Sequence, residues 1–222
     1  MKRSIHLTKD GSPTIRIEEL DITYHSRHGA LGESMHVFIE QGLRQQEMNK
    51  PVLHILEMGF GTGLNALLTY LENEGKERRI VYDTLEPFPL QESELENLNY
   101  PALLAQPALD SVFQQLHSAP WNQPFEMDNG FTLTKYETKL ENFTGGKLYD
   151  LVYYDAFAPS AQPELWEEPV FTHLYNMMQE GGALVTYCSK SIVRRAMMAA
   201  GFTVTKPPGP WGKREMVRAY KK

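Results

Sequence analysis

The spacing of apolar and polar positions changes along the chain and predicts strands alternating with helices. Residues 51–58 form a short, nearly continuous apolar run, which is typical of a strand buried on both faces of a sheet. Further strand candidates are 78–86, 131–137, 148–157 and 181–188. Helix candidates have apolar positions three or four residues apart, at 32–46, 64–75, 163–182 and 189–202. Strands joined by helical crossovers predict an α/β fold with a doubly wound, mostly parallel sheet.

Both ends of the chain depart from this alternation. Residues 4–26 resemble short strands around a turn at 10–13, which predicts a hairpin-like extension at the N-terminus. Two further strand candidates, 202–206 and 214–222, are joined by a proline-rich loop at 207–213 without a helix, so we expect one antiparallel strand there. Residues 101–124 are expected to form one helix and a loop. Ser189 is placed to cap the last helix.

Length and composition favour a single domain over residues 1–222, with an N-terminal extension at 1–50 and the doubly wound core at 51–222. No apolar stretch is long enough to span a bilayer, and the first residues lack the apolar segment of a secretory signal. Cys188 is the only cysteine, which excludes an intramolecular disulfide and a cysteine-based zinc site. The histidines show no metal-ligand spacing. We therefore expect a cytoplasmic protein without membrane contact and without a metal.

Three glycines follow the first buried strand at alternate positions. Gly59, Gly61 and Gly63 lie between this strand and a predicted helix, which is the context of a nucleotide-binding turn in such a sheet. A dinucleotide fingerprint would require another spacing, because Leu64 stands where its last glycine should fall. The turn alone is a weak signal, and it is also compatible with a tight connection that binds nothing.

Two carboxylates near the turn indicate which ligand it holds. Glu86 ends the second strand, where a carboxylate can accept both ribose hydroxyls of a nucleoside. Glu57 precedes the turn, where its charge would attract the amino group and sulfonium of S-adenosylmethionine and repel a pyrophosphate. The sequence therefore favours S-adenosylmethionine over NAD.

Asp155 marks a third position of interest, at the carboxyl end of a buried strand, which is the sheet edge where ligands bind. Phe157 adds an aromatic side chain beside it. Methyl transfer from a sulfonium needs an amine aligned with the methyl carbon, and Asp155 could accept a hydrogen bond from that amine. The alternative interpretation is that Asp155 caps the following helix.

Basic residues are concentrated at the C-terminal end. Residues 190–222 contain nine lysines and arginines against one acidic residue, in a chain whose net charge is −6. This polarity indicates an anionic partner, although solvated helix and strand faces would give the same count.

With these segments together, the chain resembles the MnmC-type tRNA methyltransferases, which make 5-methylaminomethyl-uridine at the wobble position. The matching stretches are 57–65 (EMGFGTGLN), 85–90 (LEPFPL), 155–166 (DAFAPSAQPELW), 181–202 and 208–216 (PGPWGKREM). The resemblance implies a Rossmann-like class I fold and S-adenosyl-L-methionine as donor. It also implies 5-aminomethyl-(2-thio)uridine in the tRNA anticodon stem-loop as the acceptor.

The resemblance also assigns residues to roles. Donor contacts are expected from Glu57, Gly59, Phe60, Gly61, Thr62, Gly63, Asn65, Glu86, Pro87, Asp155 and Ala156, and from Tyr24, Ser26 and Glu33 in the N-terminal segment. Asp155 and Phe157 are expected at the reaction centre. Phosphate contacts are expected from Arg194, Arg195, Lys213, Arg214 and Arg218, and Trp211 and Phe157 could stack on a flipped-out uridine. The residue at the adenine is not apparent, and Glu137 is one candidate.

We expect a methyltransferase without an FAD-oxidase portion, so the aminomethyl-uridine would be made elsewhere, by a separate FAD oxidase or another wobble-modification enzyme. Three other functions stay open. They are a methyl- or aminopropyltransferase acting on a small amine, a non-catalytic scaffold that binds adenosylmethionine or RNA, and an NAD oxidoreductase.

Overall fold

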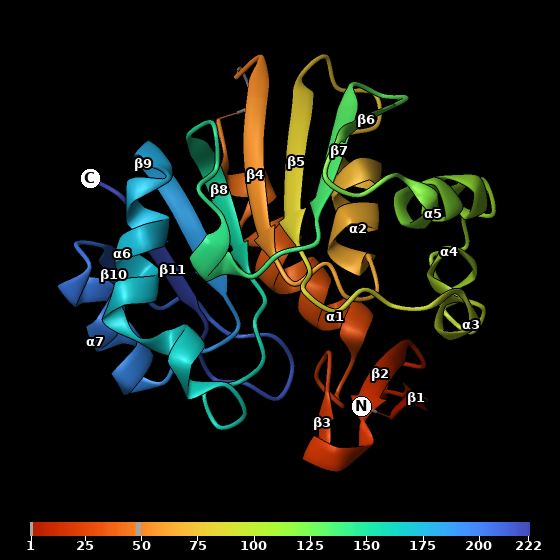
Figure 1. Cartoon of the computed structure of the whole chain (residues 1–222), viewed down its shortest axis with the longest axis horizontal. Coiled ribbons are helices and arrows are strands. Elements are labelled where there is room, and N and C mark those ends of the chain that lie inside the picture. The colour runs from red at the N-terminus through yellow and green to blue at the C-terminus, as the bar shows by residue number, and fades with distance from the viewer. Residues whose placement is uncertain (1, 48–49) are drawn as a thin grey trace.

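An eight-stranded sheet forms the centre of the computed structural model, which describes residues 2–47 and 50–222 (Figure 1). Its strands are β4 (Val52–Met58), β5 (Arg79–Leu85), β6 (Pro124–Met127), β7 (Phe131–Tyr136), β8 (Tyr149–Tyr154), β9 (Met178–Thr186), β10 (Thr203–Thr205) and β11 (Val217–Tyr220). Their spatial order is β10-β11-β9-β8-β4-β5-β7-β6. The five strands from β9 to β7 are parallel.

Helices cover both faces of this sheet, as the alternating pattern predicts. One apolar core joins the sheet to α1 (Ala30–Ser34), α2 (Leu64–Glu72), α4 (Tyr100–Leu103) and α5 (Leu109–Ser118). The other core joins it to α6 (Glu168–Asn176) and α7 (Ser191–Ala199). Alternate residues of the central strands enter different cores, which explains why these strands are apolar at nearly every position.

The N-terminal extension forms a small sheet of its own. Strands β1 (Arg3–Leu7), β2 (Pro13–Ile17) and β3 (Ile22–Thr23) pair antiparallel, so the predicted hairpin is confirmed and gains a third strand. A 3-10 turn, η1 (Glu18–Leu20), links the last two. The small sheet lies beyond the carboxyl ends of the central strands, at the lower end of Figure 1. That position places it over the predicted ligand site.

Two antiparallel strands lie in the large sheet, where the sequence predicts one. β11 runs antiparallel to both β9 and β10, as expected for the C-terminal pair. β6 also runs antiparallel, beside β7, and it was missed because its four residues carry no clear alternation. Residues 101–124, predicted as one helix and a loop, contain most of α4, all of α5 and the first residue of β6, and a short helix α3 (Glu92–Leu95) precedes them.

Two predicted helices are divided into shorter elements. Residues 32–46 form the end of α1, a π-helical turn η2 (Met35–Glu40) and a 3-10 turn η3 (Leu43–Gln45). The segment 163–182 forms η5 (Pro163–Trp166) and α6, and its last residues already belong to β9. The glycines at 181–182 therefore do not end a helix but accompany a register shift between β8 and β9.

Ser189 does not cap α7. The N-cap residue of this helix is Lys190, and its side chain makes no capping hydrogen bond. A further 3-10 turn, η4 (Leu140–Asn142), follows β7. Within the described ranges, no helix has the length and apolar character needed to cross a membrane.

Candidate active site

The predicted glycine turn follows β4 at the point where β4 and β8 end side by side. Gly59 donates its N–H to the carbonyl of Leu85 at 2.9 Å, and Asp155 donates its N–H to the carbonyl of Met58 at 3.2 Å. Gly59 and Gly61 have positive φ angles of 88° and 49°. A Cβ at Gly61 would lie 3.0 Å from the Tyr24 ring, so the turn and the N-terminal segment leave little room for a side chain at this position.

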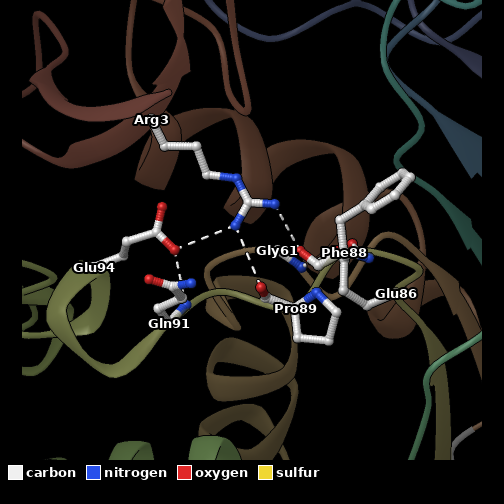
Figure 2. A network of polar contacts seen from close by, with 7 residues as sticks. All are labelled: Arg3, Gly61, Glu86, Phe88, Pro89, Gln91 and Glu94. Atoms are coloured by element: carbon white, nitrogen blue, oxygen red, sulfur yellow. Dashed lines mark hydrogen bonds and ion pairs between the residues drawn. The ribbon is translucent and has the colours of Figure 1, made fainter. Parts of the chain in front are cut away.

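Glu86 holds the glycine turn from the neighbouring strand end. Its Oε2 accepts the N–H of Gly61 at 3.0 Å, and its Oε1 accepts the N–H of Phe88 at 2.9 Å (Figure 2). A carboxylate offers about four lone-pair sites, so both oxygens can still accept ribose hydroxyls. Burial raises the pKa of Glu86, and the two backbone donors act against that rise.

Arg3 ties the small sheet to the segment after β5, and the sequence analysis missed it. Its Nη2 donates to the carbonyl of Phe88 at 2.8 Å, and its Nη1 donates to the carbonyl of Pro89 at 3.3 Å (Figure 2). Nη1 also pairs with Glu94 Oε2 at 3.2 Å. The same Glu94 oxygen accepts the N–H of Gln91, which caps α3. One guanidinium therefore fixes β1 against the loop that carries Glu86.

Glu57 lies beneath the glycine turn, fully buried. Its Oε2 accepts the hydroxyl proton of Thr84 at 2.7 Å, and its Oε1 has no hydrogen-bond partner among the residues that the structure describes. Burial raises the pKa of Glu57 to about 8, against the opposing effect of the Thr84 hydroxyl. A cation at this turn would favour the ionised form, so the site suits a positively charged ligand group.

Asp155 follows β8 and faces α2. Its Oδ2 accepts a hydrogen bond from the side-chain amide of Asn65 at 3.0 Å. Burial, reinforced by the Glu33 carboxylate, raises the pKa of Asp155 to about 7, and Asn65 and Lys213 act in the other direction. A carboxyl group with this pKa changes charge near neutral pH, which is the property required of a general base.

Two adjoining cavities share part of their lining, and Asp155 lines the first of them. The first has an empty volume of about 970 Å³ and the second of about 810 Å³, and both are lined by Tyr24, His25 and Phe157. The rings of Tyr24 and Phe157 meet edge to face, with centroids 5.2 Å apart. Asp155 lines the first cavity directly beside this aromatic pair. The site therefore consists of two adjoining hollows with an aromatic pair in the lining of both and Asp155 in the lining of the first.

Most of the predicted donor contacts line the first cavity. These are Tyr24, Gly59, Phe60, Gly61, Thr62, Asn65, Glu86, Pro87, Asp155 and Ala156. Glu57 and Gly63 do not line it, because Glu57 lies under the turn and a Cβ at Gly63 would face His117 and Phe60. Ser26 and Glu33 line the second cavity instead. Glu137 is exposed and lies outside both linings, so nothing supports it at the adenine.

The predicted phosphate-binding residues are dispersed over three segments. Arg194 and Arg195 lie on α7, and Arg218 lies on β11 with its guanidinium carbon 5.0 Å from the Tyr220 ring centroid. Arg214 is exposed in the loop before β11. Lys213 is not a free surface residue, because it lines the second cavity and pairs with Glu33.

Trp211 is 78% exposed, and its ring centroid lies 6.5 Å from that of His28. Within the described part of the chain, no group of three or more histidine, cysteine, aspartate or glutamate side chains could hold a metal ion.

Other lining residues escaped the sequence analysis. Besides Arg3, these include Ile17, Leu20, His25, Gln162 and Leu165 at the first cavity and Tyr187 at the second. Gln162, Leu165 and Tyr187 lie within the stretches 155–166 and 181–202, but their side chains suggest no specific chemistry, so only the three-dimensional packing brings these residues to the site.

Comparisons with known proteins agree with this geometry. Residues 123–222 match the model of a family described as S-adenosyl-L-methionine-dependent methyltransferase. The tRNA 5-methylaminomethyl-2-thiouridine biosynthesis bifunctional protein MnmC of Cupriavidus metallidurans is 34% identical over 225 residues, which cover 96% of this chain and 33% of that protein. The protein of the same name from Leptospira borgpetersenii is 32% identical over 217 residues, which cover 90% of this chain and 32% of that protein. The chain thus spans about a third of the length of these relatives.

Solved structures show the same fold. The crystal structure of MNMC2 from Aquifex aeolicus has a TM-score of 0.81 at 24% identity and covers 100% of this chain and 70% of that chain. Spermidine synthase from Thermotoga maritima has a TM-score of 0.56 at 10% identity, and the match covers 99% of this chain and 68% of that chain. The chain therefore has the fold of the class I S-adenosyl-L-methionine-dependent methyltransferases, matches the model of such a family over residues 123–222 and is similar to one part of the MnmC proteins.

Proposed function

We propose that this chain transfers the methyl group of S-adenosyl-L-methionine to the primary amine of 5-aminomethyl-(2-thio)uridine at the wobble position of tRNA. The observation that carries the proposal is that two cavities share Tyr24 and Phe157, and that Asp155 lines the first cavity beside this aromatic pair. The relatives named MnmC support the choice of acceptor, since they match nearly the whole chain.

The first cavity fits the donor. The Gly61 turn leaves space that a Cβ would fill, and Glu86 lies where a ribose would place its hydroxyls. Glu57 lies under the turn with an unsatisfied oxygen, which suits a cationic group. Bound here, S-adenosyl-L-methionine would supply an electrophilic methyl group on a positively charged sulfur.

The second cavity would admit the acceptor from the opposite side of Tyr24 and Phe157. An amine attacks only in its neutral form, so the ammonium must first lose a proton. Asp155, whose pKa is about 7, can accept that proton or a hydrogen bond from the amine and thereby orient the lone pair toward the methyl carbon. Closing the site with aromatic rings excludes water from the reacting atoms.

The tRNA would contact the surface around this opening. Arg194, Arg195, Arg214 and Arg218 are the proposed phosphate contacts, and Trp211 offers an exposed ring for stacking. In this proposal another enzyme makes the aminomethyl group of the uridine, and an FAD-dependent oxidase is the candidate.

The test is methyl transfer from labelled S-adenosyl-L-methionine to total tRNA from cells that lack their own wobble-amine methyltransferase, followed by nucleoside analysis. We expect labelled 5-methylaminomethyl-(2-thio)uridine with the wild-type chain and none with Asp155→Ala. Donor binding without any labelled nucleoside would overturn the proposed acceptor and leave the donor site standing.

A further inference from the structure

An ion pair joins the two ends of the chain at the second cavity. Glu33, in α1, accepts a hydrogen bond from Lys213 Nζ through Oε2 and the backbone N–H of Ser26, at 3.1 Å, through Oε1. The Glu33 side chain is 8% exposed and that of Lys213 29% exposed, so water screens this pair less than a surface pair. Both side chains line the second cavity.

Lys213 is held from a second side by an aromatic ring. Its Nζ lies 4.1 Å from the ring centroid of Tyr187, which is a cation–π contact. Tyr187 in turn donates its hydroxyl proton to the carbonyl of Ala156 at 2.8 Å. The lysine is thereby connected to the residue that follows Asp155. This arrangement does not leave the ammonium free to bind a phosphate.

The Glu33–Lys213 ion pair belongs to a set of charged and titratable groups around Asp155. Groups that act on Asp155 or respond to its charge come from every neighbouring element: Glu33 (α1), Glu57 (β4), Asn65 (α2), Tyr82 (β5), Tyr187 (after β9) and Lys213 (before β11). Glu33 disfavours the charged form of Asp155, and Lys213 favours it. Within this set Lys213 is the cation, and it contacts Glu33 rather than Asp155.

We propose that Lys213 is a positioning residue, which acts through Glu33: the ion pair neutralises Glu33 and leaves Asp155 as the carboxylate available to the acceptor amine. The inference rests on the proposed function. It reassigns Lys213 from tRNA phosphate binding to control of the reacting amine. In this arrangement Glu33 cannot compete with Asp155 for the acceptor's proton, because its charge is already matched.

The test uses three variants of the full chain: Lys213→Met, Glu33→Gln and the double variant. Titration of Asp155 is followed by NMR of ¹³C-labelled aspartate carboxyls, with the resonance assigned from its absence in Asp155→Asn. An opposite charge within a few ångströms shifts a carboxyl pKa by about 1–3 units, and Lys213 acts across Glu33, so we expect a rise of about one unit in Lys213→Met. Glu33→Gln should lower the midpoint, and the double variant should lie near the wild type.

Kinetics provide the second readout. The acid limb of the pH–rate profile for methyl transfer should move with the NMR midpoint of Asp155. A rise of one unit in that midpoint lowers the rate of Lys213→Met at pH 6 by about tenfold. The KM for S-adenosyl-L-methionine should stay within about twofold, and Lys213→Arg should restore the profile. Lys206→Met is the matched control for the titration, since Lys206 pairs with Glu215 on the surface of the same segment.

The outcomes separate the two hypotheses. An unchanged Asp155 midpoint in Lys213→Met, or midpoints that move in the same direction in both single variants, would overturn the inference, because a purely structural clamp produces no opposed shifts. Absence of the labelled nucleoside with the wild-type chain would overturn the proposed function alone. The titration would then still show whether Lys213 controls the pKa of Asp155.

Discussion

Replacing Asp155 by asparagine should stabilise the fold while it abolishes the chemistry. Burial raises the pKa of Asp155 from 3.8 to about 7. The folded state therefore binds more protons than the unfolded state between these two values, and stability falls as the pH rises through that window. Asparagine has the same shape, carries no charge and can still accept the hydrogen bond from Asn65.

The magnitude follows from the size of the pKa shift. A rise of about three units corresponds to about 4 kcal/mol of lost stability at pH 8. Asp155 borders the first cavity and is partly accessible, so water solvates some of its charge and this figure is an upper limit. We expect Asp155→Asn to be about 1–3 kcal/mol more stable at pH 8, or about 3–10 °C in Tm.

The assay is thermal and urea unfolding of both proteins between pH 4 and pH 8. The stability difference should grow with pH, whereas Asp128→Asn, in an exposed turn, should show no such trend. Methyl transfer should fall by about 10²–10⁴-fold with donor affinity nearly unchanged. A variant that is less stable than the wild type at pH 8, or a difference independent of pH, would refute the reasoning.

Other predictions concern the donor and the tRNA. Glu57, with a pKa of about 8, should release part of a proton when the cationic donor binds. Calorimetry in buffers of different ionisation enthalpy should detect this release in the wild type and not in Glu57→Gln. Arg3→Met should raise the KM for the donor several-fold with kcat retained; an unchanged KM would contradict its role in closing the first cavity. Gly61→Ala should weaken equilibrium donor binding at least tenfold, because φ is positive and the Tyr24 ring is 3.0 Å away. Trp211→Ala should weaken tRNA binding in a filter assay without affecting the donor, and equal loss of both would count against stacking.

The half of the site that belongs to the parallel sheet could be predicted from the sequence. Buried strands carry a local apolar signal, and the fold requires their carboxyl ends to meet at one edge. The positions of Gly59, Glu86 and Asp155 at that edge follow from strand ends alone, and all three line the first cavity. The other half depends on contacts between distant segments. Arg3 meets Pro89 across 86 positions, and Lys213 meets Glu33 across 180.

Local patterns also misled where two structures compete. The glycines at 181–182 follow a helical pattern and suggest its end, but they lie within β9 at a register shift. A Cβ at Gly182 would lie 2.9 Å from the carbonyl of Gln179, so the glycine serves close backbone packing rather than helix termination. The short strand β6 forms because it can hydrogen-bond to the exposed edge of β7. The residues of β6 alone do not indicate that this edge is present.

The distant contacts explain why the site has two cavities that adjoin. The N-terminal segment is fixed at one side by Arg3 to the loop after β5 and at the other by Glu33 to the C-terminal loop. Tyr24 lies between these two anchors and lines both cavities. A shift of either anchor would move Tyr24 relative to Phe157 and change the junction where the reacting atoms must meet. Donor affinity should therefore respond to Arg3, and the protonation of Asp155 to Lys213, although neither residue belongs to the glycine turn or to the strand that ends at Asp155.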